Sequence, residues 1–220
     1  MTTSPPVRAA FVASLALITL PAAAAEIDCR PEKMIRIVTR NVSPGLDPNT
    51  FAARPKTLYR LGGRYGRLEE EADPERGMRL LTVINEPDVW IANLADRTGR
   101  HIVDAGPSLK FHAPILWSED LPVALRDLEY GCEVAWMKER APRRPRAETL
   151  DGGKVDRYEA STGAYVVTLY VGRSDGRPRA LDFKNGTELL FAVRYLAFED
   201  RLEPDLGLFD TPRGVTFTKG

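Results

Sequence analysis

Short runs of alternating apolar and polar residues follow one another from Thr57 to Val103. Turn-forming residues separate these runs at intervals of about eight to twelve positions, a spacing typical of an antiparallel meander. The turn residues are mostly glycine, proline, aspartate and asparagine, which tolerate positive φ or preset a turn. Strands are therefore expected at 56–61, 64–71, 79–85, 88–95 and 99–104.

The run 88–95 differs from its neighbours because both of its faces are apolar. Alternation places Val89 and Ile91 on one side, and Trp90 and Leu94 on the other. A strand that is apolar on both faces is typical of a sheet that is covered on both sides. We therefore expect this strand to be covered twice.

A second meander is predicted in the C-terminal third. Apolar residues alternate along 165–171, and Asn185-Gly186 is a strong hairpin signal that joins 179–184 to 187–198. Asn-Gly favours a type I′ turn. Apolar residues repeat at every second position of the last strand, which predicts one face in the core: Leu189, Phe191, Val193, Tyr195 and Ala197.

Between the meanders the sequence predicts one helix, from an N-cap at Ser118 to Gly131. Acidic residues follow the N-cap, where negative charge suits the helix dipole. Its apolar stripe comprises Leu121, Ala124, Leu125 and Leu128. The next residues, 133–138, fit either a strand or a second helical turn. A basic, proline-rich stretch, 138–146, is expected to be an exposed loop.

These elements predict a mostly β (α+β) fold in a single domain, residues 26–220. We expect one curled antiparallel sheet, or half-open β-barrel, with a helix on its concave face. Such a sheet encloses either a filled core or an apolar pocket, depending on how well the helix fills it.

Residues 1–25 have the features of a cleavable export signal. Arg8 is the only charge, 9–20 is apolar, and an Ala-x-Ala site ends at Ala25. The apolar run is shorter than the roughly 20 residues that span a bilayer as a helix. We therefore expect cleavage after Ala25 and a periplasmic or secreted protein.

The two cysteines, Cys29 and Cys132, both follow the signal. An exported chain with an even number of cysteines usually pairs them, and the spacing has no CxxC redox motif. The sequence therefore predicts a structural disulfide between Cys29 and Cys132.

Charge and composition narrow the chemistry. The chain has 31 basic and 31 acidic residues, and loss of Arg8 with the signal leaves it near −1. This balance argues against a nucleic-acid partner. The only histidines, His101 and His112, have no metal-ligand spacing, and no G-x-S-x-G elbow is present. We therefore expect no catalytic residues, no metal and no cofactor.

The ranges 195–199 and 208–215 resemble the ending of the outer-membrane lipoprotein carrier family, the LolA/LolB-like proteins. In that ending a Phe, here Phe209, precedes a Pro-x-Gly-Val phrase, here 212–215. The stretch 177–183 before a hairpin is similar too. The resemblance implies a half-open β-barrel whose apolar cavity accepts acyl chains and performs no catalysis.

Under this hypothesis the protein binds or carries a lipid, an acyl chain or a lipoprotein as a monomer, with an envelope membrane or membrane protein as a further partner. The candidate pocket residues are Trp90, Leu94, Trp117, Leu121, Leu125 and Phe191. The alternative is a periplasmic protein-interaction module with a filled core, no small-molecule ligand and exposed loops that dock a partner. In either case the basic loop 138–146 could contact anionic lipid head groups or an acidic surface. A third hypothesis, an enzyme, would use His101, Asp104 and Glu86.

Overall fold

The computed structural model of the chain describes residues 29–104, 109–113 and 125–220. The proposed signal, Trp117 and Leu121 lie outside these residues. Within the described ranges twelve strands form one sheet: β1 (Met34–Asn41), β2 (Lys56–Leu61), β3 (Tyr65–Glu70), β4 (Leu80–Asn85), β5 (Asp88–Asn93), β6 (Thr98–Val103), β7 (Arg146–Leu150), β8 (Gly153–Thr162), β9 (Tyr165–Gly172), β10 (Pro178–Asn185), β11 (Glu188–Leu202) and β12 (Thr216–Lys219).

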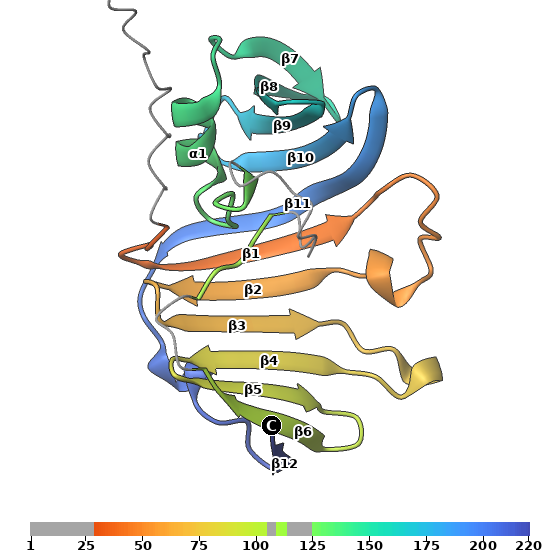
Figure 1. Cartoon of the computed structure of the whole chain (residues 1–220), viewed down its shortest axis with the longest axis vertical. Coiled ribbons are helices and arrows are strands. Elements are labelled where there is room, and N and C mark those ends of the chain that lie inside the picture. Colours follow the sequence, from red (N-terminus) through yellow and green to blue (C-terminus); the bar gives the residue numbers. More distant parts are fainter. Residues whose placement is uncertain (1–28, 105–108, 114–124) are drawn as a thin grey trace, which may run out of the picture.

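The strand order is β12-β6-β5-β4-β3-β2-β1-β11-β10-β9-β8-β7. All neighbours are antiparallel except β12, which pairs in parallel with β6. The two meanders therefore flank a central seam of β1 and β11, the longest strand (Figure 1). The sheet curls without closing, which confirms the predicted mostly β fold with one curled sheet.

The predicted strands of both meanders are confirmed to within a few residues at their ends. Four strands were not predicted: β1, β7, β8 and β12. The predicted type I′ turn is wrong. Asn185 pairs with Glu188, so Gly186 and Thr187 form the loop, and only Gly186 has positive φ, at 57°. A glycine at the first loop position is the pattern of a type II′ turn.

The predicted helix from Ser118 to Gly131 is wrong in its described part. Residues 126–131 form turns around an isolated β-bridge between Glu129 and His112. The α-helix of the described residues is α1 (Glu133–Arg140), which settles the choice left open at 133–138. Asp127 explains the turns, because its buried carboxylate accepts hydrogen bonds from Trp136 Nε1 at 2.7 Å and Arg140 Nη2 at 2.5 Å. These bonds fold the segment back onto α1.

The disulfide between Cys29 and Cys132 is confirmed, with the two Cα atoms 5.8 Å apart. Cys132 is the N-cap of α1, so the bond ties the start of the described chain to the start of the helix. None of the helices in the described residues is long and apolar enough to cross a membrane.

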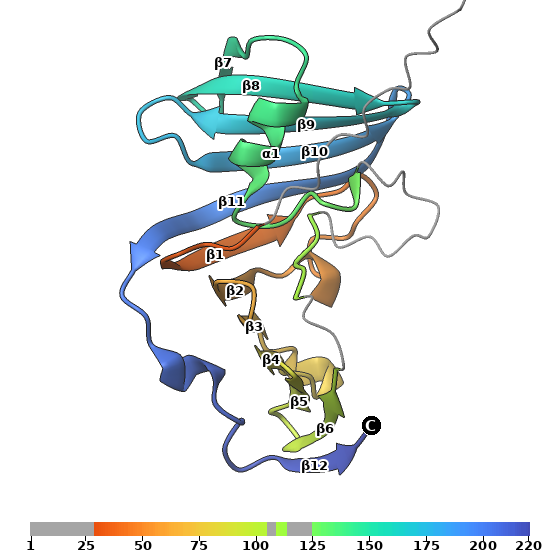
Figure 2. The same ribbon diagram turned by 60° about the vertical axis from the view of Figure 1, so that its left-hand side comes forward.

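The sheet has two faces that bury different clusters. We call the face on which α1 packs the inner face, and its cluster includes Ile37, Leu58, Leu181 and Trp136. On the opposite, outer face, Phe209 packs against Leu81 and Val83. Phe209 belongs to η4 (Leu206–Phe209), which lies in the segment that crosses from β11 to β12 (Figure 2).

Candidate functional site

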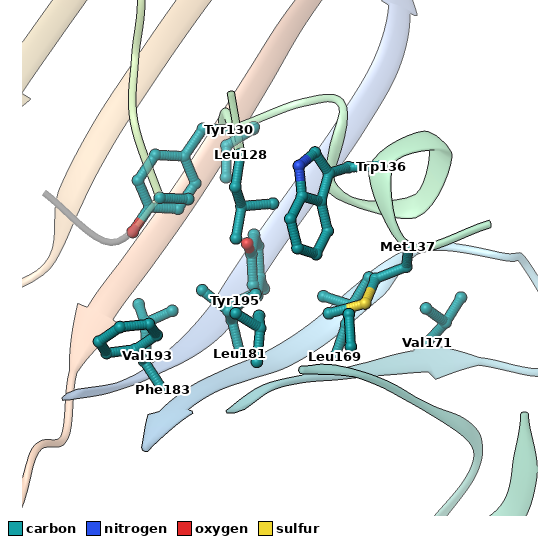
Figure 3. Close-up of a cluster of buried hydrophobic side chains, with 14 of the residues drawn as sticks. Leu128, Tyr130, Trp136, Met137, Leu169, Val171, Leu181, Phe183, Val193 and Tyr195 are labelled. Carbon is teal, nitrogen blue, oxygen red and sulfur yellow. The ribbon is translucent and has the colours of Figure 1, made fainter. Parts of the chain in front are cut away.

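The inner face is filled where α1 covers it. Trp136 and Met137 point from α1 onto Leu169 and Leu181, and all four side chains are almost completely buried (Figure 3). Tyr195 lies beside them. Side chains that are packed this closely leave little room for a ligand, because protein interiors have the density of organic crystals.

The same face continues across β4, β5 and β6, beyond β8 and β9, the strands on which α1 packs. Register pairs link Leu68 to Thr82 and Thr82 to Ile91. A second row links Ile84, Val89 and Ile102. We call the branched residues of β4, β5 and β6 on this face the inner apolar row: Ile84, Val89, Ile91 and Ile102. All four are only partly buried, and Ile91 is 42% exposed.

The expectation that 88–95 is covered on both faces is therefore wrong at Ile91. The outer side of this strand is well covered, since Ala92 is buried and Trp90 packs with the Phe209 cluster. On the inner side, α1 does not cover this strand, because the helix packs on β8 and β9. The result is an apolar strip beside a filled core.

The structure divides the predicted pocket residues between the two faces. Leu125 is buried in the inner cluster, and Phe191 packs against that cluster. Trp90 and Leu94 pack with the outer cluster. Successive side chains of a strand point to opposite faces. Trp90, which pairs with Val83, therefore lies on the face opposite Ile91. Ligand binding by any of these residues stays a prediction.

A buried ion pair lies beside the inner cluster. Arg60 of β2, 1% exposed, has its Nη1 atom 2.8 Å from Oε2 of Glu129, which is 3% exposed. Arg60 also donates to the carbonyl of Cys29 at 2.5 Å, and the carboxylate of Glu129 accepts from the backbone N–H of Phe111 at 3.2 Å. Arg60 thus connects three segments that are distant in the sequence. The sequence did contain a signal for this buried arginine, since Arg60 lies two residues after Leu58 in β2 and therefore on the same, inward face.

Glu133, at the first turn of α1, is a second buried acid. Its carboxylate accepts hydrogen bonds from the Tyr195 hydroxyl and from the backbone N–H of Gly131, both at 2.8 Å. Burial raises the pKa of Glu133 to about 7, although these bonds and Arg60 act in the opposite direction. Burial also raises the pKa of Tyr195 well above its ordinary value, and the charge of Glu133 adds to that rise.

Of the three residues of the enzyme hypothesis, His101 lies on the outer face, beside Trp90. His101 Nε2 is 2.7 Å from Asp88 Oδ1, and the imidazole stacks on Trp90 on the outer face. Both His101 and Asp88 are partly exposed. Among the described residues, no group of three or more histidine, cysteine or acidic side chains is placed to hold a metal ion.

A polar groove of about 860 Å³ lies at the ends of β1 and β3. Its walls include Arg40, Ser43, Arg54 and Glu71. Arg54 is already held by the carbonyl of Ala72 and by Asp73, whose Oδ1 is 3.5 Å away. This guanidinium is therefore neutralised within the fold, which makes the groove a weaker candidate than the inner apolar row.

No protein-family model matches the sequence, and no curated protein matches it. Solved structures do resemble the fold. An uncharacterised conserved protein from Thermus thermophilus aligns with a TM-score of 0.50 and 13% identity over 86% of this chain and 91% of that chain. At this identity the likeness concerns the fold alone.

Two further similar structures have lower TM-scores. A LolA superfamily protein from Nitrosomonas europaea aligns at 0.34, with 14% identity over 82% of this chain and 91% of that chain. The Pseudomonas aeruginosa MucA/MucB complex aligns at 0.43, with 11% identity over 83% of this chain and 57% of that chain. The solved structures that resemble this chain thus include a member of the LolA superfamily, the family that the C-terminal phrases of the sequence resemble.

Proposed function

We propose that this chain is an exported, non-catalytic binding protein that holds the acyl chain of a lipid or lipoprotein against the inner apolar row. The observation that carries the proposal is the partial exposure of Ile84, Val89, Ile91 and Ile102 beside a core that α1 has already filled. The resemblance of the C-terminal phrases to the lipoprotein carriers supports the same kind of cargo.

The row suits an acyl chain because such a ligand needs apolar area more than directed hydrogen bonds. At about 25 cal/mol per Å², covering roughly 200 Å² of apolar surface would contribute about 5 kcal/mol before the cost of ordering the ligand. Arg100 pairs in register with Ile91 and forms no ion pair with the described residues. Its guanidinium could pair with a carboxylate or phosphate at the polar end of the bound acyl chain.

Native mass spectrometry with lipid extraction tests this function, on protein purified from its own envelope fraction without detergent. We expect a monomer with stoichiometric lipid or acylated peptide. Ile91→Glu should lose that ligand, because a carboxylate would face the acyl chain. The matched control is Leu196→Glu, which places the same charge at an outer position of β11 that is 51% exposed. A ligand retained by Ile91→Glu would overturn the proposal.

A second candidate function is a protein-interaction module without a small-molecule ligand. The dense packing between α1 and Leu169, Leu181 and Tyr195 favours it, because that half of the inner face is already filled. The same experiment separates the two functions. A clean apo mass that also ignores added lipids would favour the interaction module.

A further inference from the structure

The stretch from the last turn of α1 to the first residue of β7 carries a group of cations that the fold itself does not neutralise. Lys138, Arg143, Arg144 and Arg146 are all exposed, and none of their side chains forms a hydrogen bond or ion pair with the described part of the chain. The fifth cation, Arg140, is bound to Asp127. We call the four unpaired residues the basic arch.

Most arginines on the neighbouring strands behave differently, because an acid on the same or an adjacent strand neutralises them. Five arginines of the β8–β11 half lie within 3.2 Å of an acid, in the pairs Arg157–Glu159, Arg173–Asp156, Arg177–Asp200, Arg179–Asp175 and Arg194–Asp182. The cations of the basic arch therefore differ from the arginines of this half of the sheet, which are neutralised within the fold.

The backbone between α1 and β7, residues 141–145, is irregular, and residues 142–145 are exposed. The N–H of Ala141 closes the last turn of α1 by donating to the carbonyl of Met137. Pro142 and Pro145 follow, and each lacks the N–H that would extend a helix or join a sheet. The arch joins α1 to the edge strand β7, at the end of the described fold opposite β12 (Figures 1 and 2).

One pair of like charges adds to the excess of positive charge at the basic arch. Arg146 of β7 lies directly opposite Arg157 of β8 in the strand register. Like charges in that position destabilise a sheet. Arg157 is relieved by Glu159 at 2.5 Å and, at 3.9 Å, by Glu148. Arg146 has no such partner among the described residues, so an external anion would remove a repulsion that the chain leaves in place.

From these contacts we propose that the basic arch docks the protein on the phosphate groups of an anionic lipid bilayer. A spread-out array of unpaired cations without a surrounding pocket suits a plane of phosphates, since each Lys or Arg gains energy near such a surface. Glu139 is the one acid in the range 138–146, so the net charge of this range stays positive. Docking is independent of the cargo on the inner apolar row.

Vesicle flotation of the purified protein tests the proposal, with phosphatidylcholine vesicles compared with vesicles that contain phosphatidylglycerol. We expect binding only to the anionic vesicles, and its loss at about 1 M salt, where the Debye length is about 3 Å. The triple variant R143Q/R144Q/R146Q should lower the partition coefficient about 100-fold. These side chains are exposed and unpaired, so the fold should be unaffected.

The matched control is R79Q/R213Q/K219Q, which removes three exposed cations, also without ion-pair partners in the described ranges, from the other half of the sheet and its C-terminal segment. It should bind within about twofold of the native protein, because screening confines the effect to charges within a Debye length of the surface. Equal losses in both variants, or no loss in the first, would overturn the proposal. So would equal binding to neutral vesicles. Ligand retained in the docking variant would leave the proposed function intact.

Discussion

Arg60 Nη1 lies 2.8 Å from Glu129 Oε2, and neither residue is more than 3% exposed. A buried pair of this kind adds little net stability, yet removing one partner leaves the other charge without compensation. Arg60→Met should therefore lower the free energy of unfolding by about 3–5 kcal/mol. Urea denaturation followed by tryptophan fluorescence measures the change.

The control for that variant is Arg36→Met, on the neighbouring strand β1. Arg36 also lies 2.7 Å from a carboxylate, that of Glu199, but both side chains are about one-third exposed or more. Exposed pairs contribute about 0–1 kcal/mol, so this change should cost less than about 1 kcal/mol. Similar losses in the two variants would contradict the structural contrast between them.

Stability should fall as the pH rises from 4.5 towards 7 because of Glu133. The pKa of this side chain is about 7 in the folded protein, against an ordinary value of 4.5. The folded state therefore holds the proton more tightly, and the stabilisation present at low pH is lost as the pH passes 7. The difference is about 3 kcal/mol at about 1.4 kcal/mol per pKa unit.

Glu133→Gln should flatten this dependence and be more stable than the native protein above pH 7. Urea denaturation at several pH values tests it. Glu139→Gln is the control, because Glu139 lies on the exposed side of the same helix. An unchanged pH slope in Glu133→Gln would show that another group controls it.

Loss of the disulfide should be among the larger single destabilisations in this chain. The bond closes a loop with a sequence separation of 103 residues. In the chain-entropy account such a loop is worth about 4–5 kcal/mol. Urea denaturation of Cys29→Ser/Cys132→Ser should show this loss in the free energy of unfolding. The native protein should lose a similar amount of stability once its disulfide is reduced. A loss below about 1 kcal/mol would mean that residual structure already restrains the unfolded chain.

Phe209 should be essential for the cover of the outer face. Its side chain is fully buried, with its ring centroid 5.3 Å from that of Tyr65. Phe209→Ala should cost about 3–5 kcal/mol through the cavity that it leaves. Leu206→Ala, in the same 3-10 helix but 53% exposed, should change stability by no more than about 0.5 kcal/mol. Faster amide exchange in β12 and β6 is expected for Phe209→Ala alone.

Strands with strong alternation could be predicted from the sequence, and weakly patterned ones could not. The five strands of the first meander follow the alternation of apolar residues, and the disulfide follows from the cysteine count. β7 escaped prediction because it is an exposed edge strand in which only Ala147 and Leu150 are apolar, without alternation. β12 escaped because its parallel partner, β6, is more than a hundred residues away in the sequence.

The candidate site was harder to predict because it depends on tertiary contacts. Parity alone could assign Trp90 and Ile91 to opposite faces, but not which face α1 would cover. Asp127 and Glu129 occur in an apparently helical stretch, and their buried partners Trp136 and Arg60 pull that stretch into turns. Such long-range polar contacts override local helix preference.

The central seam of β1 and β11 has a consequence for how the chain folds. Ile37 pairs with Leu58 of the nearby β2 on one side and with Phe198 on the other, so the seam itself needs residues near the end of the chain. Contacts between such distant segments slow folding, because the loop must close before the contact forms. A nascent chain therefore cannot complete this sheet until β11, which lies near the end of the described residues, has been synthesised.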